Sequence, residues 1–137
     1  MASTGIRRGT SSLAMIAETI RDDLLTGVPE TDSVRLLFGF ADEFRGSDQS
    51  GKAALIAEEP ALTGERKFDA ALAGEAEFFA GEADLPIPAW VNSPSRFAVP
   101  WFFIASRPAF HAYVLAHTPI AFKGHGVFMP REVYDRA

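Results

Sequence analysis

Proline divides this 137-residue chain into two parts with different folding potential. Seven of the nine prolines lie between Pro86 and the C-terminus. Proline lacks an amide N–H and disfavours helical backbone at the residue before it. Long helices are therefore expected only before Pro86, and short, irregular segments are expected after it.

The part before Pro86 shows the periodicity of amphipathic helices, with apolar residues three or four positions apart. Serine, threonine and aspartate mark the predicted starts, and glycine or proline marks the predicted ends. Four helices are predicted: from Ser11 or Ser12 to Gly27, from Thr31 or Asp32 to Gly46, from about Ser50 to Glu58, and from Thr63 or Gly64 to about Ala83.

The part after Pro86 predicts short helices following Pro108 and Pro119 and a brief extended segment at 127–129. A chain of this length is one ordinary domain. We therefore predict a mostly α, small single-domain helical fold with an irregular, proline- and aromatic-rich C-terminal segment. Residues 1–10 are expected to form a flexible arm, and 11–137 the domain. Within it, 11–86 form acidic helices and 87–137 a basic, aromatic-rich segment.

Like proline, charged residues are distributed unevenly between the two parts of the chain. Residues 1–86 carry a net charge of −8, whereas 87–137 carry +3 together with ten of the sixteen aromatic residues. The acidic part should repel phosphate backbones, which makes general nucleic-acid binding an unfavoured function. The basic segment either neutralises the acidic helices of its own chain or meets a partner. With no cysteine and no membrane-length apolar run, we expect a cytoplasmic protein without disulfides or membrane spans.

No catalytic or cofactor motif is complete. Residues 46–52 match the start of a phosphate-binding loop, but Ala53 stands where serine or threonine should hold magnesium, and a helix is predicted before it. His111, His117 and His125 are wrongly spaced for a helical metal pair. The carboxylates of the fourth predicted helix, Glu75, Glu77, Glu82 and Asp84, are expected in solvent. We predict no metal, no nucleotide and no other cofactor.

Aromatic and basic residues interleave after Pro86, a composition enriched at protein-binding surfaces. We expect Trp90 and Trp101 to be structural anchors. The residues predicted to contact a partner are Arg96, Phe102, Phe103, Arg107, Tyr113, Lys123 and His125.

Several of these positions belong to a pattern that resembles small actinobacterial regulator-like proteins encoded beside nucleotidyltransferase-type toxins. The pattern comprises Pro88-Ala89-Trp90-Val91, Ser95-Arg96-Phe97, Trp101-Phe102, Pro108, Thr118-Pro119, Phe122 and Gly126-Val127-Phe128, with a looser likeness at Glu58-Glu59-Pro60 and Phe68-Asp69-Ala70. The resemblance implies an antitoxin or a transcriptional regulator, and a nucleotidyltransferase-type toxin as partner.

Three functions follow as hypotheses. The first is a non-enzymatic regulatory or antitoxin-like protein that binds a protein partner through its C-terminal part. The second is a DNA-binding transcriptional regulator. The third is a small enzyme that uses the histidines with carboxylates. An exposed apolar patch favours the first, a helix N-terminus beside clustered basic residues the second, and a pocket with converging titratable groups the third.

Overall fold

Local sequence signals set the ends of the first helices in the computed structural model, which describes residues 11–104 and 107–135. The predicted arm, 1–10, lies outside these residues. Helix α1 (Leu13–Thr26) begins after Ser12, whose hydroxyl accepts a hydrogen bond from the Met15 amide, and ends at Gly27 with a positive φ of 81°. Helices α2 (Glu30–Arg45) and α3 (Gln49–Ala57) follow. Their ends lie within two residues of those predicted.

Helix α4 (Arg66–Glu82) starts later than predicted. Thr63, one of the two predicted starting residues, is held outside the helix, because its amide and its hydroxyl both donate to the Asp69 carboxylate at 2.8 and 2.9 Å. Gly64 follows with a positive φ of 98°, which a helix does not contain. A side chain one turn inside the helix therefore sets the helix start.

The segment after Pro86 is built from short elements, as predicted. Their bounds are η1 (Ala89–Asn92), η2 (Pro94–Arg96), β1 (Phe102–Phe103), η3 (Pro108–Phe110), α5 (His111–His117), α6 (Ile120–Lys123), β2 (Val127–Phe128) and η4 (Arg131–Tyr134), where η marks a 3-10 turn. Strands β1 and β2 pair in parallel, with Phe102 opposite Val127 and Phe103 opposite Phe128.

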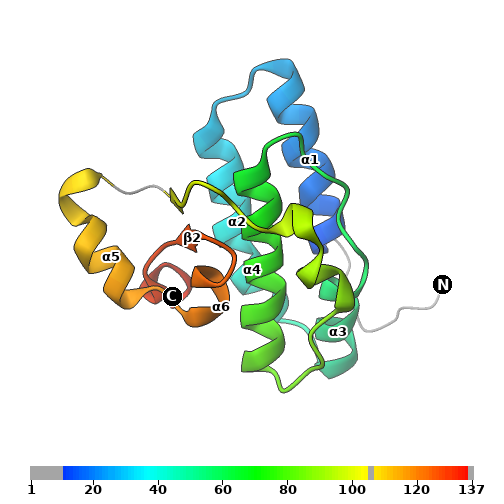
Figure 1. Ribbon diagram of the computed structural model, residues 1–137. Helices are drawn as coiled ribbons and strands as arrows, with labels where there is room; N and C mark the ends of the chain where they lie inside the picture. Colours follow the sequence, from blue (N-terminus) through cyan, green and yellow to red (C-terminus); the bar gives the residue numbers. More distant parts are fainter. Residues whose placement is uncertain (1–10, 105–106, 136–137) are drawn as a thin grey trace.

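Helix α4 is the centre of the molecule (Figure 1). It contacts α1, α2 and α3 on one side and η1, η2, α6 and β2 on the other. Small residues make this possible, since a methyl group at Gly74 would lie 2.5 Å from a ring carbon of Phe122 in α6. The C-terminal segment therefore packs directly on the backbone of α4.

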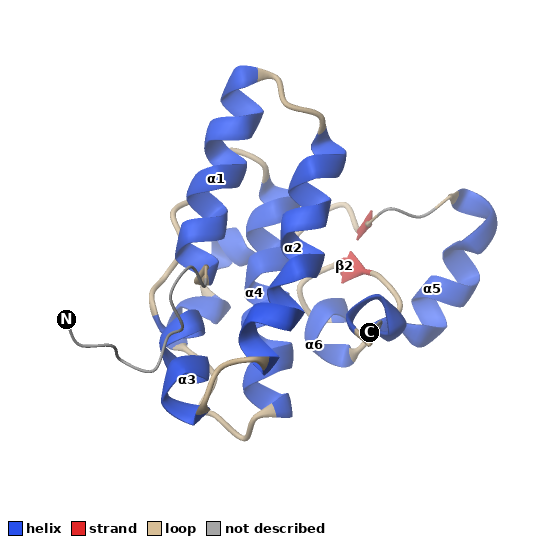
Figure 2. Cartoon of the chain, turned by 180° about the vertical axis from the view of Figure 1, so that it is seen from behind, coloured by secondary structure: helices blue, strands red, loops and turns tan. Residues whose placement is uncertain are grey.

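Helix α5 stands apart from the helical body in both views (Figures 1 and 2). Val114 is its one buried residue among those described. A helix this short is marginal in water by itself, so its tertiary contacts, such as the hydrogen bond from the Tyr113 hydroxyl to Glu132, contribute to holding it.

The described residues confirm the predicted fold class: a small single-domain, mostly α fold with very little strand. None of the helices in the described part of the chain combines the length and the apolar character needed to cross a membrane.

Candidate functional site

The structure separates the seven residues predicted to contact a partner into two groups. Arg96 is completely buried and His125 is 2% exposed, so the prediction that these two face a partner is wrong. The remaining five are at least partly accessible: Phe102, Phe103, Arg107, Tyr113 and Lys123.

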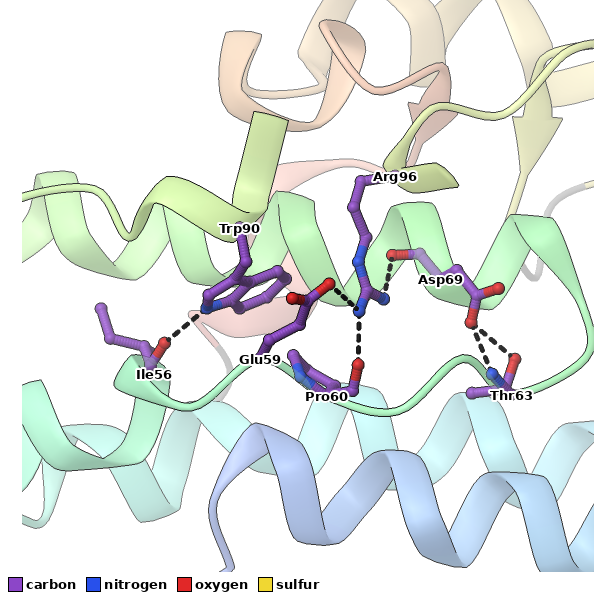
Figure 3. Close-up of polar contacts among 7 residues, drawn as sticks. All are labelled: Ile56, Glu59, Pro60, Thr63, Asp69, Trp90 and Arg96. Carbon is purple, nitrogen blue, oxygen red and sulfur yellow. Dashed lines mark hydrogen bonds and ion pairs between the residues drawn. The ribbon is translucent and has the colours of Figure 1, made fainter. Parts of the chain in front are cut away.

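Arg96 lies against the loop that joins α3 to α4 (Figure 3). One guanidinium nitrogen donates to the Pro60 carbonyl and lies 3.4 Å from a Glu59 carboxylate oxygen, and another donates to the Asp69 carbonyl at 3.3 Å. The guanidinium carbon lies 5.0 Å from the centre of the Trp90 ring. Fixed acceptors and an aromatic face replace much of the water that the buried Arg96 side chain gives up, although its Nε has no hydrogen-bond partner among the described residues.

Some of the residues that carry the resemblance contact Arg96. Trp90 is buried, as predicted for an anchor, and its indole N–H donates to the Ile56 carbonyl at 3.2 Å. Figure 3 shows that Glu59 and Pro60, Asp69, and Trp90, which come from three other stretches of the pattern, all contact Arg96. Packing inside the chain is therefore sufficient to explain this part of the pattern.

The buried side chain of His125 contacts two other segments of the chain, at residues 96–97 and at Glu77. Nδ1 lies 2.7 Å from the Arg96 carbonyl, Nε2 lies 3.0 Å from a Glu77 carboxylate oxygen, and the ring stacks on Phe97. Both neighbours are acceptors, so both contacts are hydrogen bonds only when the imidazole is protonated on both nitrogens. Neither nitrogen is left to act on a substrate.

The other two histidines lie elsewhere. His111 stacks on Phe103 with ring centres 3.8 Å apart, and His117 lies 2.8 Å from the Tyr113 carbonyl. Among the described residues, no group of three or more His, Cys, Asp or Glu side chains is arranged to hold a metal ion. The structure therefore does not bring the histidines together.

Residues 46–52 form a helix start instead of a phosphate cradle. Asp48 is the N-cap of α3, and its carboxylate accepts a hydrogen bond from the Gly51 amide at 2.8 Å. The amide that a phosphate would use therefore already binds the chain's own carboxylate. Lys52 lies in α3, with its ammonium 5.8 Å from the centre of the Phe44 ring.

Glu75 corrects the prediction that the α4 carboxylates lie in solvent. It is fully buried, and one oxygen accepts a hydrogen bond from the Tyr134 hydroxyl at 2.7 Å. Burial raises the pKa of the Glu75 carboxyl well above its usual range, although the Tyr134 hydroxyl opposes this. Burial and the neighbouring carboxyl likewise raise the pKa of Tyr134. The hydrogen bond between Glu75 and Tyr134 thus links the middle of α4 to the C-terminal turn η4.

Glu75→Gln should make stability less dependent on pH. Below the unfolded carboxyl pKa of about 4.3, both states of the natural protein hold this proton. As pH rises from there through the raised native pKa, only the native state still holds it, so the free energy of unfolding falls. Glutamine keeps an acceptor for Tyr134 and cannot ionise. Urea titrations at several pH values should show the variant gaining stability relative to the natural protein as pH rises. Parallel pH curves for the two proteins would contradict this.

An aromatic ladder connects β1 to α5. It consists of Trp101, Phe128, Phe103 and His111, whose successive ring centres lie 4.8, 4.9 and 3.8 Å apart. Trp101 is 63% exposed, so the prediction that it is a buried anchor is wrong. Its ring packs on Phe128 and otherwise faces outward.

Exposed apolar side chains are concentrated in the stretch of sequence that contains most of this ladder. Half of the ten large hydrophobic residues that are exposed in the described part of the chain lie within 99–115: Val99, Trp101, Phe110, Tyr113 and Leu115. We call these five the exposed apolar segment. Its composition is typical of a surface that a partner covers.

A groove of about 540 Å³ opens beside the ladder, between α2 and β1. Val34 and Phe38 of α2 and Phe102 and Phe103 of β1 provide its apolar walls, and Glu30, Thr31 and Arg35 complete the lining. The sequence pattern predicted the two phenylalanines as contact residues. It did not single out the α2 residues, because their apolar spacing is equally that of a buried helix face.

Many basic side chains bind groups of the same chain. Arg45 pairs with Glu82 at 2.6 Å, and Arg96 and His125 of the basic segment pair with Glu59 and Glu77 of the acidic part. Arg66, Lys67 and Arg131 also bond to carbonyl or carboxylate groups. Of these contacts, only Arg96–Glu59 and His125–Glu77 join basic side chains of the C-terminal segment to the acidic part, as the interpretation of internal charge neutralisation requires.

Comparisons of the chain with protein-family models, with curated proteins and with solved structures found no match. The resemblance to regulator-like proteins therefore remains a prediction. The α2–β1 groove and the exposed apolar segment are the candidate functional site, and their geometry alone supports it.

Proposed function

We propose that this protein is a non-enzymatic regulatory protein that binds another protein through the α2–β1 groove and the exposed apolar segment. In its specific form, the proposal follows the resemblance to regulator-like proteins. It assigns the chain an antitoxin-like role in the cytoplasm, with a nucleotidyltransferase-type toxin as the candidate partner.

One observation carries the proposal: the concentration of exposed aromatic and aliphatic side chains within residues 99–115, the stretch that contains β1 and most of α5. Aromatic side chains that are already stacked lose little conformational freedom on binding, and they dominate protein interfaces. The ladder from Trp101 to His111 is such a preordered set. Helix α5, which carries the exposed Tyr113 and Leu115, stands apart from the helical body (Figure 2).

The two other hypotheses gain no comparable support. The His125–Glu77 pair is the contact that an enzyme would use, but both ring nitrogens are already engaged. The basic residues that a DNA-binding protein would present, such as Arg45 and Arg96, bind acceptors of their own chain. The exposed apolar segment thus favours a protein partner.

Site-specific photo-crosslinking in the source cell tests this function. A photoreactive phenylalanine analogue replaces Trp101, Phe110 or Tyr113, one position per variant. Leu25 at the end of α1 is the matched control, because it is also a large exposed apolar residue. We expect the same protein to be crosslinked from the three test positions and not from Leu25. No crosslink, or equal crosslinking from Leu25, would overturn the proposal.

Alanine substitutions then measure the contribution of this surface. Phe110→Ala and Leu115→Ala should each weaken binding of the crosslinked partner by about 2 kcal/mol, or roughly 30-fold. Both side chains are exposed, so the free energy of unfolding should change by no more than about 0.5 kcal/mol. Calorimetric titration checks the affinity and urea denaturation the stability, with Leu25→Ala as the control for both.

A further inference from the structure

The pairing of β1 with β2 leaves one residue of β1 with its backbone polar groups directed outward. The Phe102 amide donates to the Gly126 carbonyl and the Ile104 amide to the Phe128 carbonyl, each at 2.9 Å. In a parallel ladder, alternate residues of a strand point their N–H and C=O groups to opposite sides. The N–H and C=O of Phe103 therefore point away from β2.

The α2–β1 groove lies along this outer edge. Side chains of successive strand residues point to opposite faces, and Phe102 indeed meets Phe68 of α4 whereas Phe103 stacks on His111 of α5. Because both phenylalanines line the same groove, the groove must run past the edge of β1 and not across one face. In both views β1 lies on the side of β2 toward the start of α2 (Figures 1 and 2).

Resting on the function proposed above, we propose that the partner supplies an extended segment that adds to the free edge of β1 as a third strand. Its backbone would exchange hydrogen bonds with the N–H and C=O of Phe103, and one of its apolar side chains would enter the groove between Val34, Phe38 and Phe102. Strand addition of this kind joins backbone hydrogen bonds, which give affinity, to side-chain pockets, which give specificity.

The charges at the groove specify the segment further. Lys67 is engaged, since its ammonium binds Glu30 and lies 4.8 Å from the centre of the Phe102 ring. The Arg35 side chain is 80% exposed, and its ion pair with Asp32 is a 3.4 Å surface contact, a kind that contributes little to stability. An acidic side chain on the segment can therefore pair with Arg35. The predicted occupant is an extended segment with an apolar residue and a nearby Asp or Glu.

Selection from a displayed library of random peptides, about six to nine residues long, tests the proposal on the full chain. We expect the selected peptides to share an apolar residue with an acidic neighbour. On binding, amide hydrogen exchange at Phe103 should slow by about tenfold or more. The Phe102 amide is the internal control, because it is already bonded to Gly126.

Two sets of variants probe the backbone and the charge separately. N-methylation of the peptide at the residue whose amide donates to the Phe103 carbonyl should abolish binding, whereas methylation at either adjacent residue, whose amide points away from β1, should not. Arg35→Glu should weaken the acidic peptides about tenfold. Arg21→Glu, an exposed change on α1, should leave them unaffected, and circular dichroism checks that both variants remain folded.

The outcomes distinguish this proposal from the function on which it rests. Selection that yields no groove-binding peptide, or peptides that leave Phe103 exchange unchanged, overturns strand addition. So does a groove covered by a second copy of the chain, which light scattering would report as a dimer. If a partner is still crosslinked from Trp101 and Tyr113, the binding function stands and only strand addition has failed.

Discussion

Replacing Arg96 with alanine is expected to lower the free energy of unfolding by about 3–5 kcal/mol. The side chain is completely buried, and alanine would remove the donors that Arg96 supplies to the carbonyls of Pro60 and Asp69. It would also remove the cation from the face of Trp90. Urea denaturation followed by circular dichroism measures the change.

Arg107→Ala is the matched control, because Arg107 belongs to the same basic segment and is exposed. Its removal should cost no more than about 1 kcal/mol. Arg96→Lys should also destabilise the protein, since an ammonium lacks the planar fork that reaches two carbonyls at once. A loss below about 1 kcal/mol for Arg96→Ala would place this side chain on the surface, as the sequence pattern had predicted.

Gly126→Ala is expected to destabilise the protein by about 2–5 kcal/mol. Gly126 has a φ of +80°, a left-handed conformation that costs other residues about 1–2 kcal/mol. The new methyl group would also lie 2.4 Å from the Ala98 carbonyl oxygen, and overpacking of this kind costs about 1–3 kcal/mol. The turn cannot simply move away, because the Ala98 amide donates to the His125 carbonyl and the Phe102 amide to the Gly126 carbonyl.

Gly81→Ala provides the comparison within the same protein. Gly81 lies in α4, and nothing is within 4 Å of the position its methyl group would take. Alanine there should stabilise the helix by about 0.5–1 kcal/mol. Opposite signs for the two glycines in chemical denaturation are the expected result. Equal stability of Gly126→Ala and the natural protein would mean that this turn has another conformation in solution.

The sequence predicted only part of the proposed site, and the cause is physical. Phe102 and Phe103 stood out because aromatic residues are common at interfaces, whereas the α2 wall formed by Val34 and Phe38 did not. A helix with apolar residues at this spacing buries most of them, as α2 does with Leu37 and Phe40. Which of these residues remains open depends on where β1 lies, and β1 is distant in sequence.

Burial of charge was the least predictable feature. Arginine, glutamate and histidine are seldom fully buried, so the sequence alone placed Arg96, Glu75 and His125 on the surface. The structure buries them because each has a partner far along the chain: Arg96 with Pro60, Glu75 with Tyr134, and His125 with Glu77. No local pattern contains such pairs.

Local sequence signals were sufficient to predict the helical fold class and most helix ends. Those features depend on interactions within about four residues. Examples are the Ser12 hydroxyl that caps α1, the left-handed backbone of Gly27 that ends it, and the amide hydrogen bonds that proline cannot donate. The tertiary structure alone decided which polar side chains are buried, that Trp101 is exposed, and that a groove lies at the edge of β1. These outcomes depend on contacts between segments that are distant in sequence and meet only when the chain folds around α4. The energy of such a contact depends on both segments, so the local sequence of one segment does not predict it.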